Sequence, residues 1–428
     1  MGNINIGKKL VLSLQHVLAM FGATVLVPII TGLDPAIALL AAGVGTLLFH
    51  LCAKGKVPVF LGSSFAFLGA IILVLNPSNL DVPVLRSAEN WDAFLGNLAL
   101  LKGGIIVAGV VYVTIAIIIY FVGVDKVQKL FSPIVTGSII MVIGLRLSPI
   151  AISNAFYVEQ GSVFSTTSLI ISSIVVLTMI LIAIFTKGFF KLVPILIAVV
   201  VGYIVSLIWG IVDTQAISDA SFFSFSQSNF TDQVFLMPKF DWTTILAIAP
   251  IALVVFIEHI GDITTNSAVV GKDFLKDPGI HRTLLGDGIA TAFAGLIGGP
   301  TNTTYSENTG VLAVTKVYDP NILRIAAVFA IILSLFGKVS AVISTIPLPV
   351  MGGISIILFG MIASIGVRIM VNANLDFSHS RNLIIGGIIL VLGIGVGELP
   401  IGDSLTISGL AIAAIVGVIL NGLLPKEI

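Results

Sequence analysis

The feature that most constrains this chain is a succession of long apolar runs. Twelve such runs follow one another, at 10–31, 35–53, 100–122, 130–147, 167–186, 192–212, 242–266, 283–298, 321–337, 349–367, 382–397 and 405–424. A helix needs about 20 apolar residues to cross the hydrocarbon of a bilayer. Because 57% of the residues are hydrophobic and only 10% are charged, we predict an all-α polytopic membrane protein.

Two shorter apolar segments, 58–76 and 301–315, are interrupted by Gly, Pro and hydroxyl residues. The second follows a Gly-Pro break and carries an acid, Glu307, where a half-length helix would start. Irregular backbone at membrane depth survives only where protein or a water-filled cavity satisfies its polar groups. An acid at such a break indicates a functional site. With both segments counted as broken spans, the chain has fourteen crossings.

The basic residues test this count through the positive-inside rule. If the N-terminus is cytoplasmic, sixteen of the 21 Lys and Arg residues fall inside, and five fall outside or at the outer ends of spans: Arg86, Lys102, Arg146, Lys239 and Lys338. Dropping either broken segment would invert every later connection and remove the asymmetry. We therefore expect both termini in the cytoplasm, with 77–98 and 213–240 as the longest outer connections.

An internal repeat relates the two halves of the chain. The sequence SSFAF at 63–67 resembles TTYSE at 303–307, and the spacing Pro-x3-Gly-x6-Gly occurs at both 133–144 and 349–360. The members of each pair lie seven spans apart, so the two halves have opposite membrane orientations. Paired broken helices in inverted repeats are typical of secondary transporters with a site near the midplane. We divide the chain into a first repeat (1–212), an extracytoplasmic loop (213–240) and a second repeat (241–428).

Three acids in the predicted spans are candidates for the site. Glu258 and Asp262 are four residues apart and therefore share one helix face. Repulsion and loss of hydration disfavour the doubly ionised pair, so we predict that the two couple protons; the alternative for Asp262 is simple hydration near the inner interface. Glu307, at a helix start, either serves a ligand or caps the helix. The backbone N–H groups freed at the breaks, at Phe65 and Ser306, can donate to a substrate carbonyl.

Four further polar residues lie inside the predicted spans. His16 either relays protons or hydrogen-bonds a neighbouring helix. Asn308 is expected to tie the broken helix to its neighbours, and Asp287 is a candidate gate or helix tie. His259 points about 100° away from Glu258 on an ideal helix and is expected only to pack.

Other features of the sequence limit the function classes. The formal net charge is zero, so no nucleic-acid partner is indicated, and the single cysteine, Cys52, excludes an internal disulfide. No Walker loop, HExxH or dinucleotide fingerprint occurs. We therefore expect neither an enzyme nor a cofactor nor a bound metal. The start of the chain has no signal-peptide cleavage site, so the first span is expected to remain.

These residues resemble the nucleobase–ascorbate transporter family, also called nucleobase–cation symporter 2, over nearly the whole chain, with bacterial uracil–proton symporters as the best match. The strongest marker is Glu307-Asn308-x-Gly310-x4-Thr315-Lys316. Support comes from Gln15-His16, GSSFAF at 62–67, IEHIGD at 257–262 and PLPVMGG at 347–353. The resemblance implies short strands in spans 3 and 10. It also implies a core domain from spans 1–4 and 8–11, a gate domain from spans 5–7 and 12–14, and a homodimer in many members.

The resemblance also assigns roles to residues. Glu258 and Glu307 would accept the ring N–H groups of a base, the amides of Phe65 and Ser306 would donate to its carbonyls, and Tyr305 would pack on its ring. Ser355 and Phe359 would lie on a gate-domain helix. The implied function is import of uracil with protons by alternating access in the bacterial inner membrane.

Three residues depart from the uracil symporters of this family. Asp262 replaces His, Ser306 replaces Gly, and Phe359 replaces Tyr. Because Asp at the first position is common in purine-transporting relatives, a xanthine or uric acid proton symporter is the alternative. An anion exchanger or channel on the same plan would need a basic residue between the broken spans, where Glu307 stands.

Overall fold

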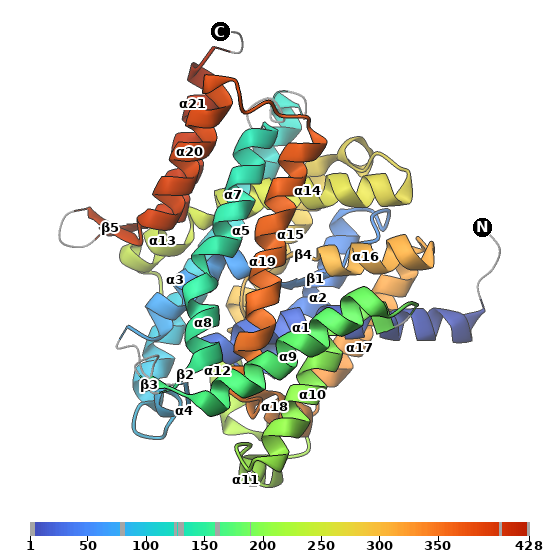
Figure 1. Cartoon of the computed structure of the whole chain (residues 1–428), viewed down its shortest axis with the longest axis vertical. Helices are drawn as coiled ribbons and strands as arrows, with labels where there is room; N and C mark the ends of the chain where they lie inside the picture. Colours follow the sequence, from blue (N-terminus) through green and yellow to red (C-terminus); the bar gives the residue numbers. More distant parts are fainter. Residues whose placement is uncertain are drawn as a thin grey trace.

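The computed structural model describes residues 5–77, 82–123, 126, 132–158, 163–188, 190–401 and 405–425, and this part of the chain is mostly helical (Figure 1). Helices long and apolar enough to cross a membrane, alone or with a helix that continues them, are α1 (Ile6–Thr31), α2 (Pro35–Cys52), α5 (Trp91–Val122), α7 (Pro133–Arg146) with α8 (Ser148–Phe156), α9 (Thr166–Phe185), α13 (Trp242–Ile248) with α14 (Ile251–Val270), and α19 (Leu348–Asn372). The remaining apolar helices are α10 (Pro194–Ile208), α15 (Ile280–Ile297), α17 (Pro320–Ser334), α20 (Ser380–Gly395) and α21 (Gly409–Leu423).

The predicted runs coincide with these helices, with four differences. The run predicted to end at 147 continues as α8 to Phe156. Residues 91–98, expected in an outer connection, form the start of α5. The run 242–266 is bent, because Ala249 and Pro250 separate α13 from α14. Helix α21 begins four residues later than the last predicted run, because Leu405–Ser408 forms strand β6 instead. Strand β6 pairs antiparallel with β5 (Glu398–Ile401).

The two interrupted segments form a short antiparallel ribbon. Strand β1 (Leu61–Ser63) pairs with β4 (Asn302–Thr304), and Gly62 lies opposite Thr303. After β1 the chain continues into η1 (Phe65–Phe67) and α3 (Leu68–Leu75), and after β4 it continues into α16 (Ser306–Thr315). Because the strands are antiparallel, α3 and α16 leave the ribbon at opposite ends. Each interrupted segment is therefore a strand followed by a half-length helix.

Neighbouring helices satisfy the polar groups of this ribbon. The Leu61 N–H donates to Thr46 Oγ1 of α2 at 2.9 Å, and Ser63 Oγ donates to the Thr24 carbonyl of α1 at 2.9 Å. Asn302 Nδ2 donates to two carbonyls, one in α2 at 3.0 Å and one in α15 at 3.2 Å. Non-helical backbone is tolerated at membrane depth when it is buried in protein in this way.

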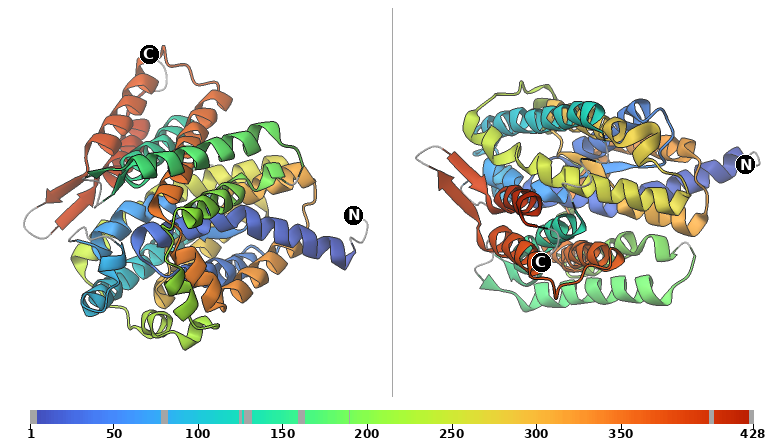
Figure 2. Two further views of the ribbon diagram at one scale, coloured as in Figure 1. Left: turned by 60° about the horizontal axis from the view of Figure 1, so that its bottom comes forward. Right: turned by 90° about the horizontal axis from the view of Figure 1, so that it is seen from above.

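The long helices form two groups (Figure 2). In one group α15 packs against α5 and α2, α2 packs against α17, and α1 packs against α17 and α16. In the other group α19 packs against α7, α8 and α9, and α20 packs against α21 and α7. Helix α14 contacts members of both groups. Helix α10 packs against α9 and α19 of the second group, and its contact with α1 links it to the first group.

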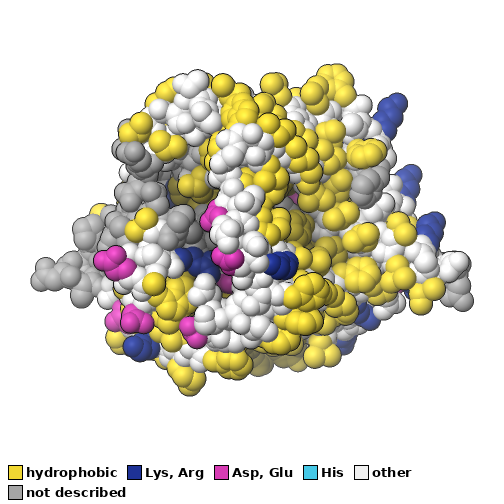
Figure 3. Space-filling view, turned by 90° about the horizontal axis from the view of Figure 1, so that it is seen from below, with side chains coloured by type: hydrophobic (Ala, Val, Ile, Leu, Met, Phe, Trp, Pro, Cys, Tyr) yellow, Lys and Arg dark blue, Asp and Glu magenta, His cyan; other side chains and the backbone are white. Residues whose placement is uncertain are grey.

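Short elements connect the long helices. They are α4 (Val82–Leu85), β2 (Tyr157–Val158) with β3 (Val163–Phe164), η2 (Phe190–Leu192), α11 (Thr214–Asp219), η3 (Ser224–Ser226), α12 (Ser228–Phe235), the irregular turn η4 (Leu275–Gly279) and α18 (Gly337–Ser344). Figure 3 shows that Lys and Arg side chains project mainly on the N-terminal side of the molecule, while acidic side chains gather toward the centre and the opposite side.

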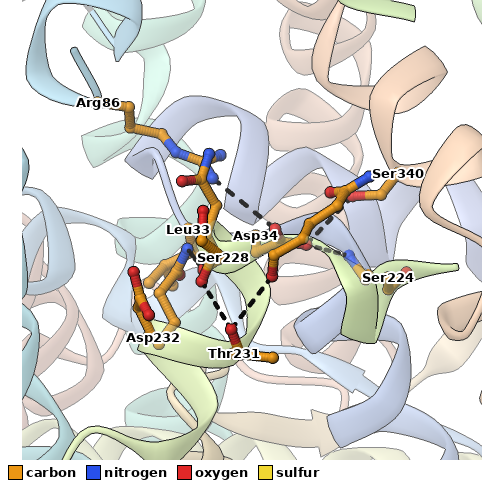
Figure 4. A network of polar contacts seen from close by, with 12 residues as sticks. Leu33, Asp34, Arg86, Ser224, Ser228, Thr231, Asp232 and Ser340 are labelled. Carbon is orange, nitrogen blue, oxygen red and sulfur yellow. Dashed lines mark hydrogen bonds and ion pairs between the residues drawn. The ribbon is translucent and has the colours of Figure 1, made fainter. Parts of the chain in front are cut away.

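A polar network around Asp34, just after the end of α1, holds these connections together (Figure 4). The Asp34 carboxylate caps α2 through the Ala36 N–H at 2.8 Å and accepts from Ser340 Oγ of α18 at 3.1 Å. Arg86, before α5, lies 3.7 Å from the same carboxylate. Buried Lys102 of α5 donates to three carbonyls at the end of α12. The connections that were predicted to lie outside are therefore anchored to the helices beneath them.

Close backbone contact between α5 and α15 gives a first prediction. A Cβ added at Gly109 would lie 2.6 Å from the Ala292 nitrogen and the Gly288 carbonyl oxygen, whereas one added at Gly96 of the same helix would meet nothing within 4 Å. We expect Gly109→Ala to destabilise the protein by about 1–3 kcal/mol through overpacking. Gly96→Ala should stabilise it by up to about 1 kcal/mol through helix propensity. Thermal unfolding of the purified protein measures both, and equal melting temperatures would refute the close contact.

Candidate functional site

Asp262 connects α14 to the start of α16. Thr304 Oγ1 donates to one of its carboxylate oxygens and Ser306 Oγ to the other, each at 2.7 Å. Both donors flank the point at which β4 becomes α16. The alternative that Asp262 is merely hydrated near the inner interface is therefore wrong, because its carboxylate is partly buried and held by two hydroxyl groups.

Glu258 lies one turn before Asp262 on α14, close enough to Asp262, Asp287 and Glu307 for their charges to interact. Glu258 and Glu307 are both partly buried. Among the residues described, no other residue donates a hydrogen bond to either carboxylate, and Glu307 accepts only from its own backbone N–H. A buried polar group normally finds a partner. Two carboxylates with unused acceptor positions are therefore available to a ligand.

The starts of two helices supply donors near these carboxylates. Phe65 begins η1 and Ser306 begins α16, and the first N–H groups of a helix have no partner within it. Their partial positive charge favours a ligand oxygen. The Phe65 ring meets the Phe359 ring of α19 edge-on, with centroids 5.9 Å apart. This contact joins the two helix groups beside the site.

Tyr305 holds the two strands together. Its ring is buried, and its hydroxyl donates to the Ser63 carbonyl at 2.9 Å. A Cβ at Gly62 would lie within 2.5 Å of two ring carbons, so the ring rests directly on the backbone of β1. Glycine at this position permits that contact. The stacking of Tyr305 on a substrate ring remains a prediction.

His16 and Asn308 tie α1 to α16. Asn308 Nδ2 donates to the His16 carbonyl at 3.0 Å and lies 3.1 Å from His16 Nδ1, and both residues are buried. This geometry matches the second of the two roles considered for His16, a hydrogen bond to a neighbouring helix. Asn308 takes the tying role expected of it.

Most of the chain matches one known protein family. A sequence profile described as "Permease family" matches residues 7–402. The chain belongs to this family, the nucleobase–cation symporter 2 permeases. A permease moves a solute across a membrane, so this nucleobase–cation symporter 2 protein is a multi-pass membrane transporter and not an enzyme.

Its relatives match over nearly their full length. The uracil permease of Bacillus caldolyticus is 42% identical over 426 residues, covering 98% of this chain and 93% of that protein. The uracil permease of Escherichia coli (strain K12) is 39% identical over 425 residues, covering 97% and 93%. The putative pyrimidine permease RutG of the same strain is 36% identical over 428 residues, covering 98% and 90%.

Solved transporters share the fold at low sequence identity. The transmembrane domain of a cyanobacterium bicarbonate transporter, BicA, has a TM-score of 0.60 and 14% identity, with 98% of both chains covered. SLC26A9 has a TM-score of 0.68 and 12% identity, covering 98% of this chain and 65% of that one. At this identity the likeness concerns the arrangement of helices alone.

The symporter also contains a buried cluster behind the site that the sequence did not predict. His259 Nδ1 lies 3.0 Å from Asp287 Oδ2 and its Nε2 lies 2.9 Å from Thr283 Oγ1, and all three side chains are fully buried. The expectation that His259 only packs is wrong. Asp287 ties α14 to α15, one of the two roles considered for it. The sequence did contain a signal for this cluster, because Asp287 lies inside a predicted span and an acid buried there needs a partner.

Ser355 and Phe359 lie one turn apart on α19 and are both buried. Ser355 Oγ donates to the Met351 carbonyl of its own helix at 2.7 Å.

A cavity of about 110 Å³ adjoins Phe65 between α3 and the α7–α8 pair, and the carboxylates do not line it. Across the described ranges, no three His, Cys, Asp or Glu side chains are grouped as metal ligands.

Proposed function

We propose that this chain imports uracil together with protons by alternating access. The observation that carries the proposal is the pair of carboxylates with unused acceptor positions, Glu258 and Glu307, beside two helix N-termini. Uracil is a flat, neutral ring with alternating N–H donors and carbonyl acceptors. The carboxylates accept its N–H groups, and the amides of Phe65 and Ser306 donate to its carbonyls. Tyr305 packs on its ring face.

Proton coupling follows from the crowding of acids. Glu258, Asp262, Asp287 and Glu307 interact at short range, and adding a proton to this cluster relieves repulsion between like charges. A charged side chain facing hydrocarbon is costly. A loaded site that carries a proton therefore crosses the barrier more readily than a doubly ionised one. Glu258 and Asp262 hold the coupled proton, and His16 connects the cluster to α1 through Asn308.

The membrane arrangement that we propose has fourteen spans in two inverted repeats, 1–212 and 241–428, joined by the extracytoplasmic loop 213–240. The paired β1–α3 and β4–α16 units support it, since they are equivalent segments of opposite direction. The basic side chains on the side where the N-terminus lies support a cytoplasmic N-terminus (Figure 3). An even number of spans then places the C-terminus in the cytoplasm as well, and we place the protein in a bacterial inner membrane.

Alternating access requires one helix group to move against the other. A core domain of spans 1–4 and 8–11 carries the carboxylates, and a gate domain of spans 5–7 and 12–14 carries Ser355 and Phe359. The Phe65–Phe359 contact lies between the two domains. Loss and renewal of this contact would accompany movement of the core, and the gate domain would supply the surface of a homodimer.

The neighbours of the site favour a nucleobase over an anion. The charged groups that interact with Glu258 and Glu307 are other carboxyls, which would repel bicarbonate or chloride. The relatives reported above, at 36–42% identity, are named as uracil or pyrimidine permeases, which favours a pyrimidine over a purine.

Transport into proteoliposomes tests the proposal. Radiolabelled uracil should accumulate when the exterior is more acidic than the lumen, and an added protonophore should abolish accumulation. Unlabelled uracil should compete more strongly than xanthine or uric acid. Stronger competition by xanthine would select the purine alternative, and uptake indifferent to the pH gradient would remove proton coupling.

Removing one of the two hydroxyl groups that donate to Asp262 gives a graded test of the site. Ser306→Ala deletes one of the two donors to this carboxylate. A hydrogen bond to a charged group contributes about 1.5–3 kcal/mol, so we expect the KM for uracil to rise by roughly tenfold or more. Ser364→Ala is the control, because this exposed hydroxyl donates only to its own helix. Equal KM values for both variants would show that the Asp262 clamp does not shape the site.

A further inference from the structure

A second, larger cavity of about 970 Å³ opens on the side of the molecule where the N-terminus lies. The start of α1, the turn after α2, the α14–α15 connection and the α16–α17 connection line it. None of the residues assigned to the substrate site contributes to its wall. Its size lies at the upper end of the range for small-molecule sites.

The wall of this cavity is strongly basic. It carries six lysines, Lys8, Lys9, Lys56, Lys272, Lys276 and Lys316, and three aspartates. Each aspartate pairs with one lysine: Asp319 with Lys9 at 2.9 Å, Asp277 with Lys56 at 2.5 Å and Asp273 with Lys276 at 3.5 Å.

Three lysines keep their positive charge uncompensated. Within the ranges that the structure describes, Lys8, Lys272 and Lys316 have no acidic partner. Lysine ammonium groups are common phosphate ligands. A concave wall with this excess of positive charge complements a phosphate-bearing anion.

An apolar groove of about 340 Å³ lies on two helices that also border the basic cavity. Leu10, Val11 and Leu14 of α1 line one wall, and Phe329, Ile332 and Leu333 of α17 line the other. Leu10 directly follows Lys9 in the chain. On α17 the groove begins nine residues after Pro320, which lines the basic cavity, a distance of about 13 Å along a helix. The groove therefore leads away from the basic cavity along two apolar helices.

We propose that the basic cavity and the apolar groove together bind an anionic phospholipid. The phosphate headgroup lies among the lysines, and one acyl chain fills the groove between α1 and α17. Basic pockets at a membrane surface select anionic headgroups. Lys316 follows the last residue of α16, Lys272 follows α14, and Lys8 lies in the first turn of α1. The headgroup therefore connects the three helices that carry Glu307, Glu258 and His16.

Thermal unfolding of the delipidated full-length protein tests this site. Micelles containing dioleoylphosphatidylglycerol should raise the Tm more than micelles containing dioleoylphosphatidylcholine. The triple variant Lys8→Gln, Lys272→Gln, Lys316→Gln should lose more than half of this extra rise, and so should Leu10→Ser, Leu14→Ser. Lys272→Gln alone should lose a measurable part, which keeps the test available if the triple variant folds poorly.

Matched controls remove equal charge or apolar surface elsewhere. The charge control is the triple variant Lys187→Gln, Lys191→Gln, Arg368→Gln, and the apolar control is the double variant Leu177→Ser, Leu181→Ser. These residues are exposed and lie outside the basic cavity and the apolar groove, so both controls should leave the lipid effect intact. An extra Tm rise that both site variants retain would overturn the proposal. An equal rise with glycerol 3-phosphate, unaffected by Leu10→Ser, Leu14→Ser, would instead assign the lysines to a soluble phosphate and overturn the lipid assignment.

Discussion

Glu258→Gln is expected to abolish uracil accumulation, with at least a hundredfold fall in initial uptake. The carboxylate has no hydrogen-bond donor from another residue in the described part of the chain, so its acceptor positions serve the substrate. Glutamine keeps the shape but removes the charge and one of the two acceptor oxygens, and it cannot carry the coupled proton. A hydrogen bond to a charged group contributes about 1.5–3 kcal/mol, and loss of the coupled proton adds to the fall in uptake. Coupling to the pH gradient should disappear with the carboxyl group.

Glu89→Gln is the matched control for this experiment. Glu89 is exposed in the connection before α5, so the same chemical change there should leave uptake within about twofold of wild type. Both variants should have the same melting temperature without substrate. Near-normal, gradient-driven uptake by Glu258→Gln would contradict the assignment of Glu258 to uracil and to the proton.

The largest effect on stability is expected at the buried pair behind the site. His259→Ala removes the partner of Asp287 Oδ2, and Asp287 Oδ1 already lacks a partner among the described residues. Leaving a buried polar group without its partner costs about 1–3 kcal/mol, and more where the group is charged. We therefore expect severe loss of stability in His259→Ala, with the protein recovered mainly as aggregate.

A double-mutant cycle separates this pair from general packing. His259→Leu and Asp287→Leu should each destabilise the protein strongly, whereas the double variant should be more stable than the sum of the single effects predicts. Removing both polar partners leaves no orphaned group. Additive losses in the cycle, measured by thermal unfolding, would show that the two side chains act independently.

The sequence predicted the elements well because hydrophobic length and chain breaks are local properties. Pro and Gly at the two interrupted segments marked the breaks in which β1 and β4 form, and the family resemblance implied that short strands occur there. The signature around Glu307 marked the start of α16. The positions of Glu258 and Asp262 on one face followed from helix geometry alone. The hairpin of β5 and β6 was missed because Leu405–Ser408 is apolar enough to continue the predicted span.

Side-chain partners were harder to predict, because they depend on which helices become neighbours. The clamp of Asp262 by Thr304 and Ser306 joins residues more than 40 positions apart. It also links two departures from the family pattern, Asp262 and Ser306, which the sequence presented as separate. The basic cavity likewise gathers lysines from the start of α1 and from three connections that are distant in the chain.

The most direct test of uracil–proton symport is proton movement caused by uracil itself. A pH-sensitive dye trapped in proteoliposomes reports the lumen after uracil is added outside, with no pH gradient and with the membrane potential clamped. The account predicts prompt acidification of the lumen by wild type, a much smaller response to xanthine, and none in Glu258→Gln. Entry of radiolabelled uracil without acidification would contradict it.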